Sequence, residues 1–158
     1  MRAVGNNHPS MPHSQAVALM ADPAPVMIWL SDVNGQCLHL NKRLLAFWGI
    51  SNEDLASFDW TSTMHPDDAL RVGPIVAVAV AAKRGFSVEA RYRNHAGQYR
   101  ILRTDAEPTI EADGTHTGFI GVNIDVTEEA EATAALRRSE ERFARFMAHL
   151  PGLAWIKD

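Results

Sequence analysis

The sequence predicts an α+β domain in which five antiparallel strands form one sheet and short helices cover one of its faces. Stretches in which polar and apolar residues alternate occur as a pair before a helical region and as three more after it. Glycine, proline and asparagine mark the turns between these stretches. The order of strands and helices is typical of a sheet that is covered on one side.

The strands are expected where side chains alternate. The clearest alternation runs from Phe86 to Arg93, where apolar residues take every second position. Asn34-Gly35 is a turn signal that joins the first two strands into a hairpin. The other four strands are expected over residues 26–31, 36–40, 98–107 and 115–125.

In the last strand, three branched residues, Ile120, Val122 and Ile124, take alternate positions. This period of two predicts that they face the core. Asp125 or Thr127 can accept a hydrogen bond from the free amides of a following helix, and Glu128 has the capping-box spacing from Asp125. The last strand is therefore expected to lead through a short polar hinge into a long charged helix over residues 128–150.

Short helices are expected over residues 41–49 and 51–56, and a longer one over residues 67–83. His65-Pro66-Asp67-Asp68 begins the longer helix, because proline suits the first helical position and acids are stabilised at the positive end of the helix dipole. Pro74 should kink this helix or restart it. One face of the helix carries Val72, Val76, Ala79, Val80 and Lys83.

Residues 118–121 and 125–127, Gly-Phe-Ile-Gly and Asp-Val-Thr, resemble the ending of a PAS domain, a small sensory module of signalling proteins. The His-Pro-Asp-Asp box at 65–68 fits the same family. Two further matching stretches are residues 28–32 with Gly35 and Asn41, and residues 89–93 with Gly97, Tyr99 and Arg100. The resemblance implies a PAS fold over residues 22–127 and supplies its strand order. Ile101 departs from the tryptophan usual in this subgroup, which weakens any ligand inferred by analogy.

Further segments are expected on both sides of this domain. Residues 1–13 are interpreted as a flexible tail and residues 14–21 as a short N-terminal cap helix. Residues 151–158, Pro-Gly-Leu-Ala-Trp-Ile-Lys-Asp, match Pro25–Asp32 in register at Pro, Trp and Asp. We therefore expect them to be the truncated start of a second PAS module, with residues 128–150 as the connector.

Composition limits the classes of partner and the compartment. A chain of 158 residues holds one domain of about 100 residues plus extensions. Its net charge of −4 indicates no surface for nucleic acid or membrane. Cys37 is the only cysteine, which excludes an intrachain disulfide. The sequence also shows neither a membrane-length apolar stretch nor a leader, so we expect a cytoplasmic protein.

Metal, haem and flavin sites are not expected, and the sequence names no other cofactor. None of the histidines has a two-ligand helical spacing and there is no Cys-x-x-Cys, so His65 is interpreted as a helix cap. Within the resembled family, haem needs an axial histidine on the long helix and flavin photochemistry needs a cysteine in an Asn-Cys-Arg-Phe-Leu-Gln motif. Residues 67–83 and the surroundings of Cys37 have neither, so we expect neither cofactor.

Catalysis is not expected within this chain either. Asp67 and Asp68 are adjacent, which suits a helix start better than an acid and base on two sides of a substrate. The sequence has no phosphate loop, nucleophile elbow, kinase signature or cyclase signature. Any kinase or cyclase domain is therefore expected elsewhere in the full-length protein.

The candidate ligand site is an apolar cleft between the helices and the sheet, with Asn41 as its polar contact. Its other expected walls are Ile28, Phe47, Trp48, Trp60, Met64, Val76, Val80, Tyr92, Ile120 and Val122. Simple core packing without a ligand needs the same residues. Both interpretations stay open.

The helix over residues 128–150 carries a heptad pattern that is typical of a coiled-coil seam: Ala132, Leu136, Phe143, Phe146 and Leu150. One interpretation is a parallel signalling helix in a homodimer, and the other is a surface helix folded back onto its own sheet.

The expected function is a sensory PAS module of a sensor histidine kinase or a cyclic-di-GMP enzyme, in which Asp125 and Thr127 relay a ligand- or partner-induced change. The alternative is a dimerising spacer that binds nothing.

Overall fold

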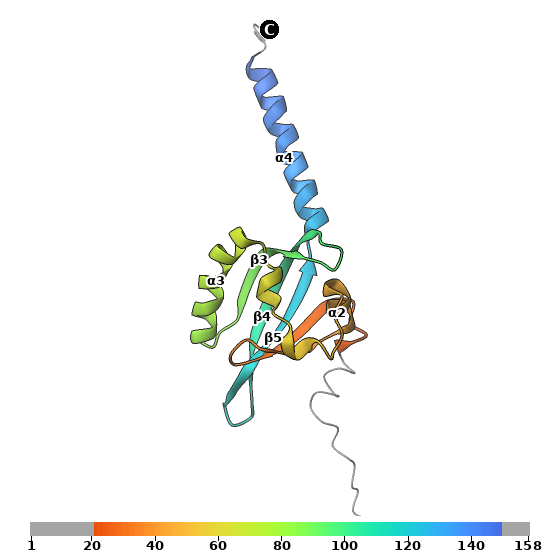
Figure 1. Ribbon diagram of the computed structural model, residues 1–158. Coiled ribbons are helices and arrows are strands. Elements are labelled where there is room, and N and C mark those ends of the chain that lie inside the picture. The colour runs from red at the N-terminus through yellow and green to blue at the C-terminus, as the bar shows by residue number, and fades with distance from the viewer. Residues whose placement is uncertain (1–20, 150–158) are drawn as a thin grey trace, which may run out of the picture.

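The computed structural model describes residues 21–149, which form one antiparallel sheet with helices on one face and a long helix that leaves the domain (Figure 1). The strands are β1 (Met27–Asp32), β2 (Cys37–Leu40), β3 (Phe86–Arg93), β4 (Tyr99–Ile110) and β5 (His116–Asp125). Their order in the sheet is β2-β1-β5-β4-β3. The predicted fold class and the five-stranded sheet are confirmed.

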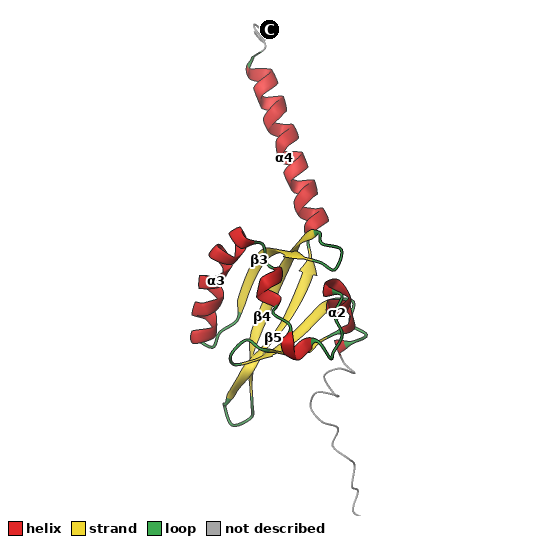
Figure 2. Ribbon diagram, in the orientation of Figure 1, coloured by secondary structure: helices red, strands yellow, loops and turns green. Residues whose placement is uncertain are grey.

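The helices are α2 (Lys42–Trp48), α3 (Pro66–Ala81) and α4 (Thr127–Ala148). Figure 2 shows α2 and α3 on the same side of the sheet. The prediction of a helix over residues 51–56 was wrong, because only a 3₁₀ turn at Leu55–Ser57 forms there. The Asp54 carboxylate accepts hydrogen bonds from the backbone N–H and the hydroxyl of Ser51, both at 2.8 Å. This local turn competes with helix formation.

Pro74 does not divide α3, which continues from Pro66 to Ala81. The prediction that the helix could restart at Pro74 is therefore wrong. A proline removes the amide that would bond the carbonyl four residues earlier, which here is that of Leu70. The Leu70 side chain is 81% exposed, so this part of the helix faces water that can hydrogen-bond the freed carbonyl. Lys83, expected on the buried face, lies beyond the helix end in a left-handed conformation (φ 52°).

The prediction for the two faces of β5 was also wrong. Phe119 and Asn123 are 3% and 4% exposed, whereas Ile120 is 41% exposed. The inner face of the strand, which the helices cover, therefore carries Phe119, Gly121 and Asn123. The branched residues lie on the outer face of the sheet.

Gly121 explains this choice of face. It lies opposite Trp29 on β1, and a Cβ added to Gly121 would be only 2.2 Å from the indole ring. The indole thus occupies the space that any larger residue at 121 would need, and its Nε1 donates to Asn123 Oδ1 at 3.1 Å. A large side chain on one strand fills the gap left by a glycine on the next.

Helix α4 leaves the end of β5 and points away from the sheet (Figure 1). Thr127 at its start is 5% exposed, but between residues 131 and 149 every side chain except Ala134 is exposed. Within residues 21–149, no helix is both long enough and apolar enough to cross a membrane.

Candidate functional site

Asn41 is a structural residue and not the polar contact of the cavity. It is fully buried, and its Oδ1 accepts from the amides of Ile28 at 3.0 Å and Leu44 at 3.2 Å. Its Nδ2 donates to the carbonyls of Ala21 at 3.0 Å and Val26 at 2.8 Å. All four hydrogen-bonding positions of the amide are used, so Asn41 joins the start of α2 to β1 and leaves nothing for a ligand.

The His-Pro-Asp-Asp box fastens α3 to β3. His65 Nδ1 accepts from the Asp67 amide at 3.3 Å, which is the capping role that the sequence predicts. Asp68 Oδ2 accepts from the backbone N–H of Arg91 at 2.7 Å and from its Nε at 2.9 Å. The side-chain hydrogen bond from Arg91 is the largest cause that lowers the pKa of Asp68 to about 2. The box therefore fixes the helix and strand that provide much of the cavity wall.

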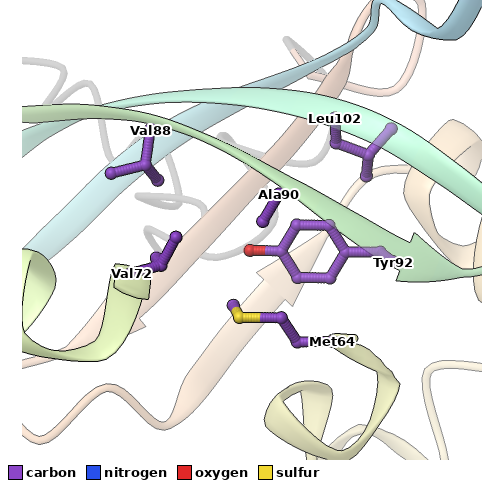
Figure 3. Packing of buried hydrophobic residues seen from close by; sticks show 6 residues of the cluster. All are labelled: Met64, Val72, Val88, Ala90, Tyr92 and Leu102. Carbon is purple, nitrogen blue, oxygen red and sulfur yellow. The ribbon is translucent and has the colours of Figure 1, made fainter. Parts of the chain in front are cut away.

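A cavity of about 90 Å³ lies between the helices and the inner face of the sheet. Figure 3 shows part of its wall, with Val72 from α3, Val88 and Tyr92 from β3, and Met64 below the Tyr92 ring. Burial is the main cause that raises the pKa of Tyr92 to about 12, so its phenol is neutral at physiological pH. The residues that line the cavity include no charged side chain.

Six of the predicted wall residues line this cavity: Trp48, Trp60, Met64, Val76, Val80 and Tyr92. Four apolar residues, Ile28, Phe47, Ile120 and Val122, do not line it, and neither does Asn41. Ile28 pairs with Val122, and both lie with Ile120 on the outer face of the sheet. Phe47 instead lines an open groove beside Arg43 and His95.

Sequence reasoning missed the strand residues that complete the wall. They are Trp29, Ser31, Cys37, Phe86, Val88, Thr104, Phe119 and Asn123, together with Val72 of α3 and Gly35. The alternation of β3 could have indicated Phe86 and Val88, because Tyr92 was already assigned to the same face. Thr104 and Asn123 gave no such signal, since polar residues in a strand are ordinarily assigned to the solvent side.

Cys37 lies in the cavity wall without the properties of a reactive cysteine. Burial, followed by the nearby Asp32 carboxylate, raises the pKa of its thiol to about 11. The thiolate is the reactive form, so this thiol is inert at neutral pH. The structure agrees with its interpretation as a small residue at the edge of the core.

The hinge between β5 and α4 is a compact set of hydrogen bonds. Asp125 Oδ1 accepts from the Thr127 backbone N–H at 3.0 Å and hydroxyl at 2.6 Å, while its Oδ2 accepts from Arg100 Nε at 2.7 Å. Burial acts to raise the pKa of the Asp125 carboxyl, but the hydrogen bonds from Thr127 and Arg100 together lower this pKa below its usual value. Thr127 Oγ1 in turn accepts from the Ile101 amide at 2.8 Å. The first turn of α4 is thus fixed to both β4 and β5.

The predicted seam residues of α4 do not pack on their own domain. Leu136, Phe143 and Phe146 are 62%, 64% and 62% exposed, and Ala132 is exposed as well. Leu150 lies outside the described residues, as do the segments 1–13, 14–20 and 151–158. Among residues 21–149, no cluster of three or more His, Cys, Asp or Glu is placed to hold a metal ion.

The strand order, the helices on one face and the apolar cavity between them and the sheet define this as an α+β domain of the PAS type. The family model of the PAS fold matches residues 38–123 of the sequence. The chain therefore belongs to the PAS fold family, as the resemblance implied.

Two curated relatives match most of this chain. The uncharacterised protein y4lL of Sinorhizobium fredii is 31% identical over 144 residues, which are 88% of this chain and 17% of the relative. The sensor protein FixL of Bradyrhizobium diazoefficiens is 24% identical over 131 residues, 82% of this chain and 26% of the relative. The chain thus spans about a sixth of the length of the first relative and about a quarter of the second.

Solved structures share the fold. A structure of an RNA-binding light-oxygen-voltage receptor has a TM-score of 0.71 at 17% identity, covering 89% of this chain and 41% of that one. A sensory box histidine kinase/response regulator from Burkholderia thailandensis has a TM-score of 0.59 at 23% identity, covering 83% and 97%. At these identities the likeness shows the fold alone.

Proposed function

We propose that this chain is the sensory, signal-transducing PAS module of a multidomain cytoplasmic protein, either a sensor histidine kinase or a cyclic-di-GMP enzyme. One observation carries the proposal. Strand β5 supplies Phe119 and Asn123 to the cavity wall and reaches the hinge at Asp125 only two residues later. A change of packing in the cavity therefore has a short, rigid connection to α4.

The mechanism needs two arrangements of α4 that differ slightly in free energy. The hinge hydrogen bonds hold the first turn of α4 on the ends of β4 and β5, so a shift of β5 changes the direction in which the helix leaves. A small molecule in the cavity or an upstream partner would supply that shift. The similarity to the sensor protein FixL over most of this chain supports a sensory role.

The output in this proposal is a parallel homodimer through α4. The helix has an apolar stripe formed by the exposed seam residues Leu136, Phe143 and Phe146. Exposure of this stripe to water is unfavourable, and a second helix could cover it. The folded-back alternative would bury this stripe against the sheet, but α4 points away from it (Figure 1). A second PAS module and an output domain would follow in the full-length chain.

A dimerising spacer that binds nothing is the second candidate, and the small size of the cavity favours it. A cavity of about 90 Å³ is smaller than the engineered cavity of about 150 Å³ that holds benzene, so it leaves little room for a ligand. Native mass spectrometry of the protein purified from its own host separates the candidates. A bound small molecule supports the sensor, whereas its repeated absence supports the spacer.

The relay is tested by Asp125→Ala in the full-length protein. Loss of this carboxylate releases Arg100 and Thr127 together, so the output should become insensitive to conditions that change it in the wild type. The measurement is phosphate transfer from ATP or cyclic-di-GMP turnover. Thermal unfolding of the variant checks that the domain remains folded.

Asp113→Ala is the matched control. Asp113 also accepts a hydrogen bond from the amide of a threonine two residues later, at 2.8 Å, but it lies in the β4–β5 turn at the other end of the sheet from α4. This variant should respond like the wild type. A normal response of Asp125→Ala would refute the relay.

A further inference from the structure

Two polar atoms in residues of the cavity wall have no protein partner in the described part of the chain, Trp48 Nε1 and Thr104 Oγ1. Both atoms are buried, and the whole of Thr104 is only 6% exposed. Buried polar groups in native proteins are almost always hydrogen-bonded, because leaving one unpaired costs free energy. An N–H donor and a hydroxyl therefore require partners from outside residues 21–149.

The surrounding side chains do not provide these partners. Phe47 and Phe58 pack against the Trp48 indole with ring centroids 5.9 Å and 4.9 Å away, which fixes the direction of its Nε1. Asn123 Oδ1, the amide oxygen in the wall, already accepts from Trp29. The Thr104 hydroxyl is near enough to the Tyr92 phenol to oppose the rise of its pKa, but it lies outside hydrogen-bonding geometry.

The charge and volume of the cavity limit what it can accept. The lining residues include no charged side chain, so a charged ligand would lose its hydration without compensation. The volume is about 90 Å³, whereas an engineered apolar cavity of about 150 Å³ holds benzene. A ligand of this cavity is therefore smaller than benzene, and haem or flavin could not enter without a large expansion.

We propose that the cavity binds a small neutral molecule of about five non-hydrogen atoms that offers one hydrogen-bond acceptor to Trp48 Nε1 and one polar group to Thr104 Oγ1. A five-membered azole has this size and chemistry. The proposal names the ligand class of the sensory module proposed above and rests on that function. Its two polar contacts come from α2 and β4, so the ligand would bridge a helix and the sheet.

The test uses pyrazole and thiophene, two neutral five-membered rings of which only pyrazole carries a nitrogen acceptor and an N–H donor. Each is titrated into the full 158-residue chain while the indole N–H resonances are followed by NMR. Trp48→Phe identifies the Trp48 signal. Pyrazole should shift this signal and bind at least about tenfold more tightly than thiophene, because only pyrazole pairs with the unpaired atoms.

Two buried threonines provide a matched pair of variants. Thr104→Val removes the unpaired hydroxyl and should reduce the preference for pyrazole to threefold or less, while the domain stays as stable as before or becomes more stable. Thr63 Oγ1 donates to the Trp60 carbonyl at 2.7 Å and Thr63 does not line the cavity. Thr63→Val should therefore lower stability and leave the preference for pyrazole intact.

Three results would overturn the ligand class: an unmoved Trp48 signal, equal affinity for the two rings, or an unchanged preference in Thr104→Val. A Trp48 indole that shows exchange with a bound water which pyrazole does not displace would also overturn it, because the occupant would then be water. None of these results bears on the relay or the α4 dimer, which Asp125→Ala and the solution mass test separately.

Discussion

Single residues in this domain act mainly by joining elements that are distant in the sequence. Asp68 is the clearest example, since its carboxylate reaches from the first turn of α3 to both the backbone and the side chain of Arg91 on β3. The carboxylate is largely buried, with 12% of the side chain exposed, while 40% of the Arg91 side chain meets solvent. The pair is therefore worth more than a surface ion pair, but solvent still screens it.

This pair predicts a specific loss of stability in acid. The folded-state pKa of Asp68, about 2, lies below the value of about 3.9 expected in an unfolded chain. The stabilisation is therefore complete above pH 4 and is lost as the pH falls towards 2. Urea unfolding at pH 5 and at pH 2.5 should show that the wild type loses about 1–2 kcal/mol more stability than Asp68→Asn does.

Asp67→Asn provides the control for this experiment. Asp67 is the adjacent acid, but its side chain is 78% exposed and reaches Arg91 only at 3.9 Å. The free energy of unfolding of Asp67→Asn should therefore change between pH 5 and pH 2.5 as that of the wild type does. Equal profiles for the wild type and Asp68→Asn would contradict the proposed strength of the Asp68–Arg91 pair.

At the scale of elements, the contact between β1 and β5 depends on the match between Trp29 and Gly121. Gly121→Ala would place a methyl group against the indole ring, where a Cβ lies 2.2 Å from ring atoms. Overpacking of this kind costs about 1–3 kcal/mol. We expect that decrease in the free energy of unfolding, measured with urea, together with a shift of the Trp29 indole N–H signal as its bond to Asn123 is disturbed.

Gly73→Ala is the comparison, because an added Cβ at Gly73 on α3 meets open space. Its free energy of unfolding should stay within about 1 kcal/mol of the wild type. A Gly121→Ala variant as stable as Gly73→Ala would mean that the indole moves aside easily. The close packing that we describe between β1 and β5 would then be wrong.

Most elements could be predicted from the sequence, but the buried face could be predicted for some of them only. The alternation in β3 gave the correct bounds and the correct buried side, because three of its four polar positions are charged. In β5 the same rule failed, because Gly121 and Asn123 lie on the inner face and the apolar Ile120 lies outside. The deciding contact is between Trp29 and Gly121, which are on different strands, and its register depends on tertiary structure.

The candidate site was predictable only in part for the same reason. Trp48, Trp60, Met64 and the valines of α3 were found because they are apolar and their helical face was clear. Asn41 was assigned to the cavity because its four structural hydrogen bonds, to segments on both sides of it in the sequence, cannot be read from a motif. Thr104 and Asn123 were missed because polar residues on a buried strand face run against the usual pattern.

At the scale of the whole molecule, the hinge places an extended helix on a small domain. α4 has an apolar stripe that its own domain leaves exposed, and a helix of this length gains most of its stability from packing against a partner. In the proposed dimer, a second copy of the chain covers Leu136, Phe143 and Phe146. The stripe is short, so single substitutions should be enough to disrupt the dimer.

The measurement that tests this most directly is the solution mass, by light scattering, of the 158-residue chain and of a chain that stops at Thr127. We expect a dimer for the longer chain and a monomer for the shorter. Phe143→Glu in the longer chain should also give a monomer, while Arg138→Glu, away from the seam, should remain a dimer. Monomers of both lengths, or dimers of both, would contradict the assignment of α4 as the dimer seam.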